Sequence, residues 1–421
     1  MMRNMLNRFA EVPLAAWLIG ALCAVYLEQW VGDPLTELLL LPKIPVLFGC
    51  LIVLKTPKLI PSTVVFLILI YAVPICVIAY AVRKPANMIA AKLFSGPIWI
   101  SAILHLGLLY LILHIWSDIS AYRELTLKFT LIAIIVTLSL NLINGYMGEF
   151  SCSHPGFMAL GAYGASVFSL VLFADDKNFG EALLPGILGP FMFPLGLIFG
   201  GFISAIGALV VAIPSFRTRG DYLAIISLAF TFIVKSLIEN LEFIGGPRGL
   251  GSQPDFSNLL VVFIWTVLCV WIINNYVQSV YGKATNAVRD DEIAADAMTV
   301  DTRKTKMVTF MFAAFWAGVA GGLFAHVLRF VNPSTFGIQK LAEVLAMVYF
   351  GGLNSVYGSI VGAVSLSLLG EALRPLELFK WIIIPLLLIL VMIYRPTGLI
   401  AFKEFNIRNL IQPKHIPEDE V

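Results

Sequence analysis

The sequence predicts an all-α protein, a polytopic membrane bundle of about 11 helical segments with broken or re-entrant helices in its core. Composition is the first reason, because 59% of the 421 residues are hydrophobic and only 13% are charged, against roughly 45–50% and about 25% in soluble domains. A mean hydropathy of +0.90 is the second. The third is the repetition of apolar runs close to the roughly 20 residues that a membrane-spanning helix needs.

Charge and motif content exclude several other classes. The formal net charge is only +2, so no basic surface favours nucleic-acid binding. The five cysteines include no Cys-x-x-Cys pair, and the five histidines are not spaced as metal ligands. The phosphate-binding pattern Gly-x4-Gly-Lys-Ser/Thr is absent too. The sequence therefore predicts no catalytic residue, no metal site and no bound cofactor, and any ATP would have to bind to partner subunits.

Residues 1–120 are predicted to form an N-terminal membrane extension of about three helices. The candidate spans are Ala10–Trp30, Pro61–Val82 and Pro97–Trp116. The first is too long for a removed signal peptide and lacks a small-residue cleavage site nearby. Ile44–Leu54 has about half the length of a span, so it is re-entrant, interfacial or part of a short tilted helix. A polar patch from Ser117 to Glu124 then ends the extension.

Residues 121–402 are predicted to form a core of about eight helices, followed by a cytoplasmic tail at 403–421. The expected segments of the core are Leu125–Ile143, Phe157–Phe173, Leu188–Ile213, Tyr222–Phe243, Leu259–Tyr276, Met307–Phe330, a broken stretch from Leu341 to Leu373, and Trp381–Tyr394. Basic residues at 217–219, at 283–306 and after residue 394 favour cytoplasmic positions for these segments. The loop Asp175–Glu181, with three acids and one lysine, suits the opposite side.

Three glycine-rich breaks interrupt the core, at 144–156, 245–251 and 351–358. Flexible polar backbone at membrane depth must be buried in protein or line a water-filled cavity. The breaks are therefore expected to line a transport pathway. An ordinary loop between two helices is the alternative for the first break, and His154 alone is more typical of a structural histidine. The candidate pathway residues are Gly145, Gly148, Ser151, Ser153, His154, Gly245, Gly246, Gly249, Gly351 and Gly352.

The one large polar loop, residues 282–306, carries five acidic and five basic residues. Its segment Asn286–Val300 has the composition of a short amphipathic helix, in which Arg289 and Glu292 can pair at i, i+3. Spacing places Ala287, Asp291, Ala294, Ala295 and Met298 on one face, and Arg289, Glu292 and Asp296 on another. A helix of that length is marginal alone in water, so we expect it to pack against a partner; a solvated connecting loop is the alternative.

At these residues the chain resembles a known family. Arg289-Asp290-Asp291-Glu292-Ile293-Ala294-Ala295-Asp296-Ala297-Met298 resembles the cytoplasmic coupling loop of permease subunits of high-affinity branched-chain amino-acid ABC importers. It departs from the family pattern at Asp296, where Glu is common, and at Thr299, where the family has glycine. The resemblance implies that Arg289, Asp290, Asp291, Glu292, Ala294, Ala295, Asp296 and Met298 contact the ATPase.

Further blocks resemble the same family in the same order. They are Gly145–Tyr163, in which Glu149, Ser153 and Pro155 depart from the family pattern, Arg217–Ile225, Gly245–Leu250, Phe350–Gly358 and Arg395–Leu399. Together they cover roughly residues 125–402. The N-terminal extension resembles that of the larger of the two permeases in such an importer.

The resemblance implies a complete machine in the bacterial inner membrane. A second, shorter permease, two ATP-binding subunits carrying ATP and Mg, and a periplasmic substrate-binding protein would accompany this chain, and the substrate would be Leu, Ile or Val. Importers of urea, amides or other amino acids share the scaffold and stay open as alternatives. An ion-coupled secondary transporter using Glu149, His154 or Glu343 and a scaffold subunit without a pathway are the remaining alternatives.

Overall fold

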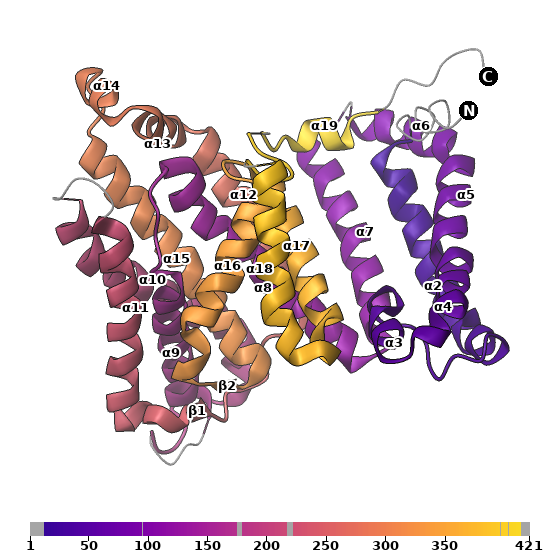
Figure 1. Ribbon diagram of the computed structural model, residues 1–421, viewed down its shortest axis with the longest axis horizontal. Helices are drawn as coiled ribbons and strands as arrows, with labels where there is room; N and C mark the ends of the chain where they lie inside the picture. Colours follow the sequence, from indigo (N-terminus) through magenta and orange to yellow (C-terminus); the bar gives the residue numbers. More distant parts are fainter. Residues whose placement is uncertain are drawn as a thin grey trace. The chain divides into compact units, whose positions relative to one another are not determined.

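The computed structural model describes residues 12–94, 96–174, 179–216, 222–395, 397–402 and 404–413. Over these ranges the chain is almost entirely helical (Figure 1). Nine helical stretches there are long and apolar enough to cross a membrane, and the shorter apolar helices Val356–Ala372 and Ile382–Tyr394 follow them. The nine are Leu14–Leu38, Pro57–Ala81, Ile98–Asp118, Ala121–Met147, His154–Phe173, Gly186–Ser215, Leu223–Asn240, Leu259–Gln278 and Thr302–Leu328. The prediction of a polytopic all-α membrane protein is confirmed.

The chain divides into two compact units. The first contains the described residues of Met1–Leu127, Gly370–Lys380 and Asn406–Val421, and the second those of Lys128–Leu369 and Trp381–Phe405. The helices of the first unit are α2 (Leu14–Leu38), α3 (Cys50–Lys55), α4 (Ile60–Leu67), a π-helical turn (Ile68–Ala72), α5 (Val73–Ala81), α6 (Arg83–Phe94), α7 (Ile98–Asp118) and α19 (Ile407–Ile411).

Two details of the first unit differ from expectation or refine it. The first span was expected to end at Trp30, but α2 continues through Asp33 and Pro34 to Leu38, because helical backbone bonding extends beyond the apolar run that marked the span. The half-length stretch folds as a single 3-10 turn, Leu47–Gly49, and the six-residue helix α3. A helix of that length cannot cross a membrane.

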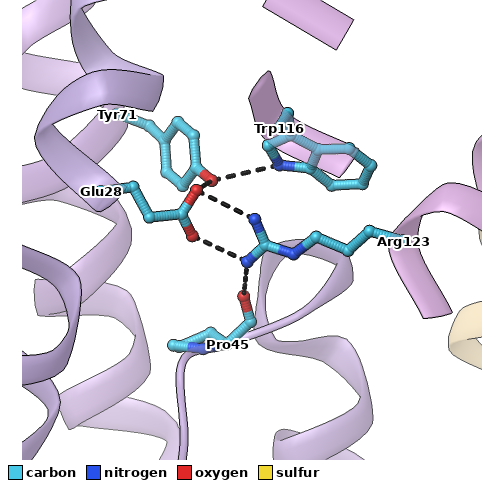
Figure 2. Close-up of polar contacts among 5 residues, drawn as sticks. All are labelled: Glu28, Pro45, Tyr71, Trp116 and Arg123. Carbon is cyan, nitrogen blue, oxygen red and sulfur yellow. Dashed lines mark hydrogen bonds and ion pairs between the residues drawn. The ribbon is translucent and has the colours of Figure 1, made fainter. Parts of the chain in front are cut away.

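The first unit contains a buried ion pair (Figure 2). Arg123 Nη2 lies 2.7 Å from Glu28 Oε1, and the two side chains are 1% and 0% exposed. The same guanidinium donates to the carbonyl oxygen of Pro45 at 3.0 Å. Tyr71 donates its hydroxyl proton to Glu28, and Trp116 donates to the Tyr71 oxygen at 3.3 Å. One carboxylate and one guanidinium thus connect residues 28, 45 and 71 with the stretch of chain from Trp116 to Arg123.

The second unit is built around three helices that lie side by side: α9 (His154–Phe173), α10 (Gly189–Ser215) and α15 (Thr302–Leu328) (Figure 1). Glycines let their backbones touch. A Cβ on Gly161 would lie 2.1 Å from the carbonyl oxygen of Gly318, and a Cβ on Gly321 would lie 2.0 Å from that of Met158. Small residues at helix contacts are a typical solution in membranes, where apolar side chains gain little from leaving lipid.

Among its described residues, the second unit also contains eight other α-helices, in whole or in part. They are α8 (Ala121–Asn141), which begins in the first unit, α11 (Tyr222–Asn240), α12 (Leu259–Gln278), α13 (Val280–Asp290), α14 (Glu292–Ala297), α16 (Ile338–Gly351), α17 (Val356–Ala372) and α18 (Glu377–Tyr394). The only strands in the described ranges, β1 (Leu250–Gly251) and β2 (Phe330–Val331), pair antiparallel with Leu250 opposite Val331. α13 and α14 lie at one end of this unit and the two strands at the other (Figure 1).

Replacing Arg123 by methionine should destabilise the first unit by about 3–5 kcal/mol, because the Glu28 carboxylate would stay buried without its partner. The double variant Arg123→Met/Glu28→Gln should recover much of that loss. Thermal unfolding of the purified chain in detergent measures both effects. Glu37→Gln is the control, because Glu37 lies at an exposed position of α2, the helix that contains Glu28. An unfolding temperature of the Arg123 variant equal to that of the control would contradict the assignment.

Replacing Gly161 by alanine should lower stability by about 1–3 kcal/mol, since the added methyl group would overlap the backbone of α15. Gly107 in α7 is the matched control, because a Cβ there meets nothing within 4 Å. Alanine at position 107 should be neutral or stabilising by up to about 1 kcal/mol. Equal unfolding temperatures for the two variants would show that close packing at Gly161 is not required.

Candidate functional site

The polar loop folds as two short helices, α13 and α14, so the single helix expected over Asn286–Val300 is wrong. Asp291 separates them because its backbone is extended, with φ −159° and ψ 106°. Its carboxylate accepts hydrogen bonds from the backbone N–H groups of Ile293 (2.9 Å) and Ala294 (3.0 Å). An aspartate that caps a new helix in this way ends the preceding one.

The division of the loop into α13 and α14 changes both the expected helix face and the expected ion pair. Of the five residues predicted on one face, only Ala295 is buried, while Ala287, Asp291, Ala294 and Met298 are exposed. Arg289 pairs with its neighbour Asp290 at 2.7 Å instead of with Glu292. The extended residue between the helices moves Glu292 away from the face of Arg289, and Glu292 pairs with Lys306 at 2.9 Å. Asp296 is exposed.

Two large apolar side chains at α14 are exposed. Ile293, within the helix, and Met298, directly after it, are each 76% exposed. Both lie on the protein's polar loop, beside the acidic residues Asp290, Asp291 and Asp296, which are also exposed. Exposed apolar side chains beside charges are typical of surfaces that bind a partner protein.

Thr299 takes a backbone conformation that favours glycine, with φ +68°. The N–H of Thr299 donates to Asp296 O at 3.0 Å, and the N–H of Val300 donates to Ala295 O at 3.1 Å. These bonds end α14 in the arrangement that usually has glycine at this position. Thr299, which stands where the resembling family has glycine, therefore occupies the position of this turn at which a side chain is strained.

The first glycine-rich break forms a non-helical passage between α8 and α9. After Asn141 the helix widens into a π-helical turn, Leu142–Met147, and Gly148 has φ +76°. The chain is then non-helical to Ser153. We call residues 148–153 the passage.

The predicted polar residues of the passage, and His154 directly after it, are in protein contact. Ser151, Ser153 and His154 are each 0% exposed. The hydroxyls of Ser151 and Ser153 lie 2.8 Å apart, and His154 meets the ring of Phe157 edge-on with centroids 5.8 Å apart. These contacts are those of a packed structural segment, as expected for non-helical backbone enclosed in protein.

The first and third breaks meet at Asn141, a residue that the sequence analysis did not select. Its Oδ1 accepts from the N–H of Asn354 at 3.2 Å, and its Nδ2 donates to Ser359 Oγ at 2.7 Å. A Cβ on Gly145 would lie 2.6 Å from the nitrogen of Asn354. The buried asparagine within an apolar helix was the available sequence signal.

The glycines of the third break serve close backbone packing. A Cβ on Gly351 would lie 2.0 Å from Gly358 O, and Gly352 has φ +131° and would meet Ile400 O at 2.5 Å. The expected break between Leu341 and Leu373 is confirmed, since α16 ends at Gly351 and α17 begins at Val356.

The second break lies apart from the other two, at the strand end of the second unit (Figure 1). Gly245, Gly246 and Gly249 have φ values of +90°, +51° and +82°. A Cβ on Gly249 would lie 2.4 Å from the carbonyl oxygen of Val331 in β2. The structure therefore brings together two of the three predicted breaks and places the third with β1 and β2.

Two contacts connect the polar loop to the passage. Lys306 Nζ, at the start of α15, lies 2.6 Å from Glu149 Oε1 and 2.9 Å from Glu292 Oε2. The side chain of Arg289 covers Gly148, where a Cβ would lie 2.4 Å from Arg289 Cγ. Sequence reasoning counted Lys306 only as a basic loop residue.

Several residues used in the sequence analysis lie outside the residues that the structure describes. They are residues 10 and 11 of the first expected span, residues 175–178 of the acidic loop, Arg217–Asp221 and residue 396 of the resemblance blocks, and residues 403 and 414–421 of the tail. Among the residues that are described, no group of three or more His, Cys, Asp or Glu side chains is placed to hold a metal ion.

Multiple apolar helices, enclosed non-helical breaks and an exposed polar loop with its own helices define a multi-pass membrane protein. The family model described as branched-chain amino acid transport system / permease component matches residues 122–393. The chain belongs to this family, and it is a transport permease and not an enzyme.

Known relatives support the same assignment. The chain is 32% identical to the high-affinity branched-chain amino acid transport system permease protein LivM of Salmonella typhimurium over 306 residues, which are 64% of this chain and 68% of that protein. It is 31% identical to LivM of Escherichia coli K12 with the same coverage. The permease protein LivH of Salmonella typhimurium is 28% identical over 164 residues, 37% of this chain and 53% of that protein. No solved structure matches the chain.

Replacing Thr299 by glycine should stabilise the end of α14 by about 1 kcal/mol, because the left-handed backbone no longer carries a side chain. Hydrogen–deuterium exchange of the Val300 amide, which donates to Ala295 O, should slow by about fivefold. Thr302→Gly, at the beginning of α15, serves as the control and should accelerate local exchange. Faster exchange at Val300 in the Thr299 variant would contradict the strained geometry.

Proposed function

We propose that this chain is the larger permease subunit of an ATP-driven importer that carries leucine, isoleucine and valine across the bacterial inner membrane. The observation that carries the proposal is α14 with its exposed Ile293 and Met298. This helix lies in the segment that resembles the coupling loop of the family. The match to the family model and the names of the relatives support the substrate class.

The proposed assembly contains a second, shorter permease, for which the similarity to LivH is the support. Two ATPase subunits would bind α13 and α14 from the cytoplasm and would carry the ATP and Mg, since this chain has no phosphate-binding motif. A periplasmic binding protein would deliver the substrate at the other side of the membrane. The tail at 403–421 would lie in the cytoplasm with the coupling residues.

In this mechanism, ATP binding closes the ATPase pair and moves α14. The permease pair then changes from an outward-facing to an inward-facing state, as a two-state assembly biased by its ligands. Residues of the three breaks would border the route and hold the substrate briefly through backbone groups. A site in a transport route must release its ligand, so strong selectivity would reside in the binding protein.

The decisive experiment is purification of the tagged full chain from its native host in mild detergent, followed by reconstitution into vesicles. We expect two ATPase subunits and a second permease to copurify, and ATP-dependent leucine uptake that isoleucine and valine inhibit. Uptake inhibited instead by urea or short amides would assign the related substrate class. A chain that transports without ATP or partners would overturn the importer.

Replacing Ile293 by glutamate should reduce the copurified ATPase by about tenfold, because an apolar anchor at the centre of a protein interface typically contributes 1–2 kcal/mol or more. Met298→Glu should act similarly. Ile338→Glu is the control, because Ile338 is also exposed, at 59%, but begins α16 just after β2. Normal ATPase content in both α14 variants would exclude this helix as the docking element.

A further inference from the structure

Three charged side chains from three separate segments meet beside α14. Glu149 comes from the passage, Glu292 is the first residue of α14, and Lys306 lies in the first turns of α15. The Lys306 ammonium lies 2.6 Å from Glu149 and 2.9 Å from Glu292, so it bridges both carboxylates. The exposed fractions of the three side chains are 11% for Lys306, 25% for Glu149 and 48% for Glu292.

This partial burial makes the bridge stronger than a surface ion pair. Exposed pairs contribute little because water and salt screen them and both side chains lose entropy. Here one ammonium, largely shielded from solvent, separates two carboxylates that would repel each other without it. The lysine therefore determines whether Glu149 and Glu292 stay close.

A second contact joins the end of α13 to the chain at Gly145 and Gly148. The Arg289 side chain, from the end of α13, covers Gly148, and its Nη1 lies 3.5 Å from the carbonyl oxygen of Gly145. Only glycine at position 148 leaves room for this side chain, because a Cβ would lie 2.4 Å from Arg289 Cγ. The passage thus touches α13 through Arg289, and Lys306 of α15 connects it to α14.

The passage is in turn bonded to α11. The backbone N–H of Cys152 donates to Ser227 Oγ at 2.9 Å, and its carbonyl oxygen accepts from Thr231 Oγ1 at 2.9 Å. Both hydroxyl residues are buried. A displacement of the passage would therefore act on a membrane-spanning helix, and the passage itself lacks a helical hydrogen-bond ladder that would resist bending.

We propose that Lys306 is a positioning residue that makes α14 and the passage move together, so that motion of the ATPase reaches α11. This rests on the proposed function and adds the route by which the coupling helix acts on the membrane helices. Packed side chains, hydrogen bonds and salt bridges between neighbouring elements can carry coupling of this kind. The Glu292–Lys306–Glu149 bridge and the Cys152 bonds to α11 supply the contacts.

The test measures ATP hydrolysed and leucine taken up by the complete importer in vesicles. Lys306→Met keeps the length of the side chain and removes its charge. We expect normal subunit content, ATP hydrolysis within about twofold of the unchanged importer, and about tenfold less leucine carried per ATP, which is within the range for residues that carry coupling. Lys306→Arg should restore most of the ratio of leucine uptake to ATP hydrolysis.

Two further variants separate transmission from simple stability. Glu149→Gln should lower the ratio of uptake to hydrolysis in the same way, and combining it with Lys306→Met should add little, because both break one connection. Lys304→Met, at an exposed position two residues away, is the matched control and should leave the ratio unchanged. If the Lys306→Met chain does not insert into the membrane, Glu149→Gln alone decides whether the bridge transmits motion.

Some results would overturn the proposal. An unchanged ratio in Lys306→Met or Glu149→Gln would show that the bridge transmits nothing. A parallel loss of hydrolysis, uptake and subunit content would assign Lys306 to stability or docking. If the unchanged importer shows no ATP-dependent leucine uptake, the proposed function fails first, and that result is read before any variant is compared.

Discussion

The absence of water in the lipid interior is the constraint on which this structure depends, because every backbone N–H and C=O group there must find a partner within the protein. Helices satisfy their own backbone, so any non-helical segment has to be surrounded by other parts of the chain. The passage meets this requirement through Asn144, Ser227 and Thr231, whose side chains bond its backbone. The junction of α16 and α17 meets it through Asn141 and through glycines that allow backbones to touch.

Much of the helical pattern could be predicted from the sequence because an apolar run of sufficient length has few alternatives. The expected spans Pro97–Trp116 and Leu259–Tyr276 differ by only a few residues from α7 and α12. The breaks were also predictable, since clustered glycine and polar residues interrupt such runs. Local chemistry alone decides these features.

The parts that were wrong or missed depend on contacts between distant residues or on a single cap. Asp291 divides the polar loop because its side chain competes for backbone N–H groups, whereas helical spacing alone favours one continuous helix. The pairing of Glu292 with Lys306 instead of Arg289 follows from that division. The meeting of Gly145 with Asn354, more than 200 positions apart, required the tertiary arrangement.

The ion pair between Glu28 and Arg123 has a consequence for the order in which the chain can be assembled in a membrane. The two residues are 95 positions apart, so ribosomes deliver the carboxylate to the membrane well before its partner exists. Until then, that glutamate has to remain protonated, stay near the interface, or be shielded by a helper protein. Synthesis of the beginning of α8 would therefore act as the step that commits the earlier helices to their final depth. The N-terminal extension can reach its final structure only after Arg123, which follows it in the sequence, has been made.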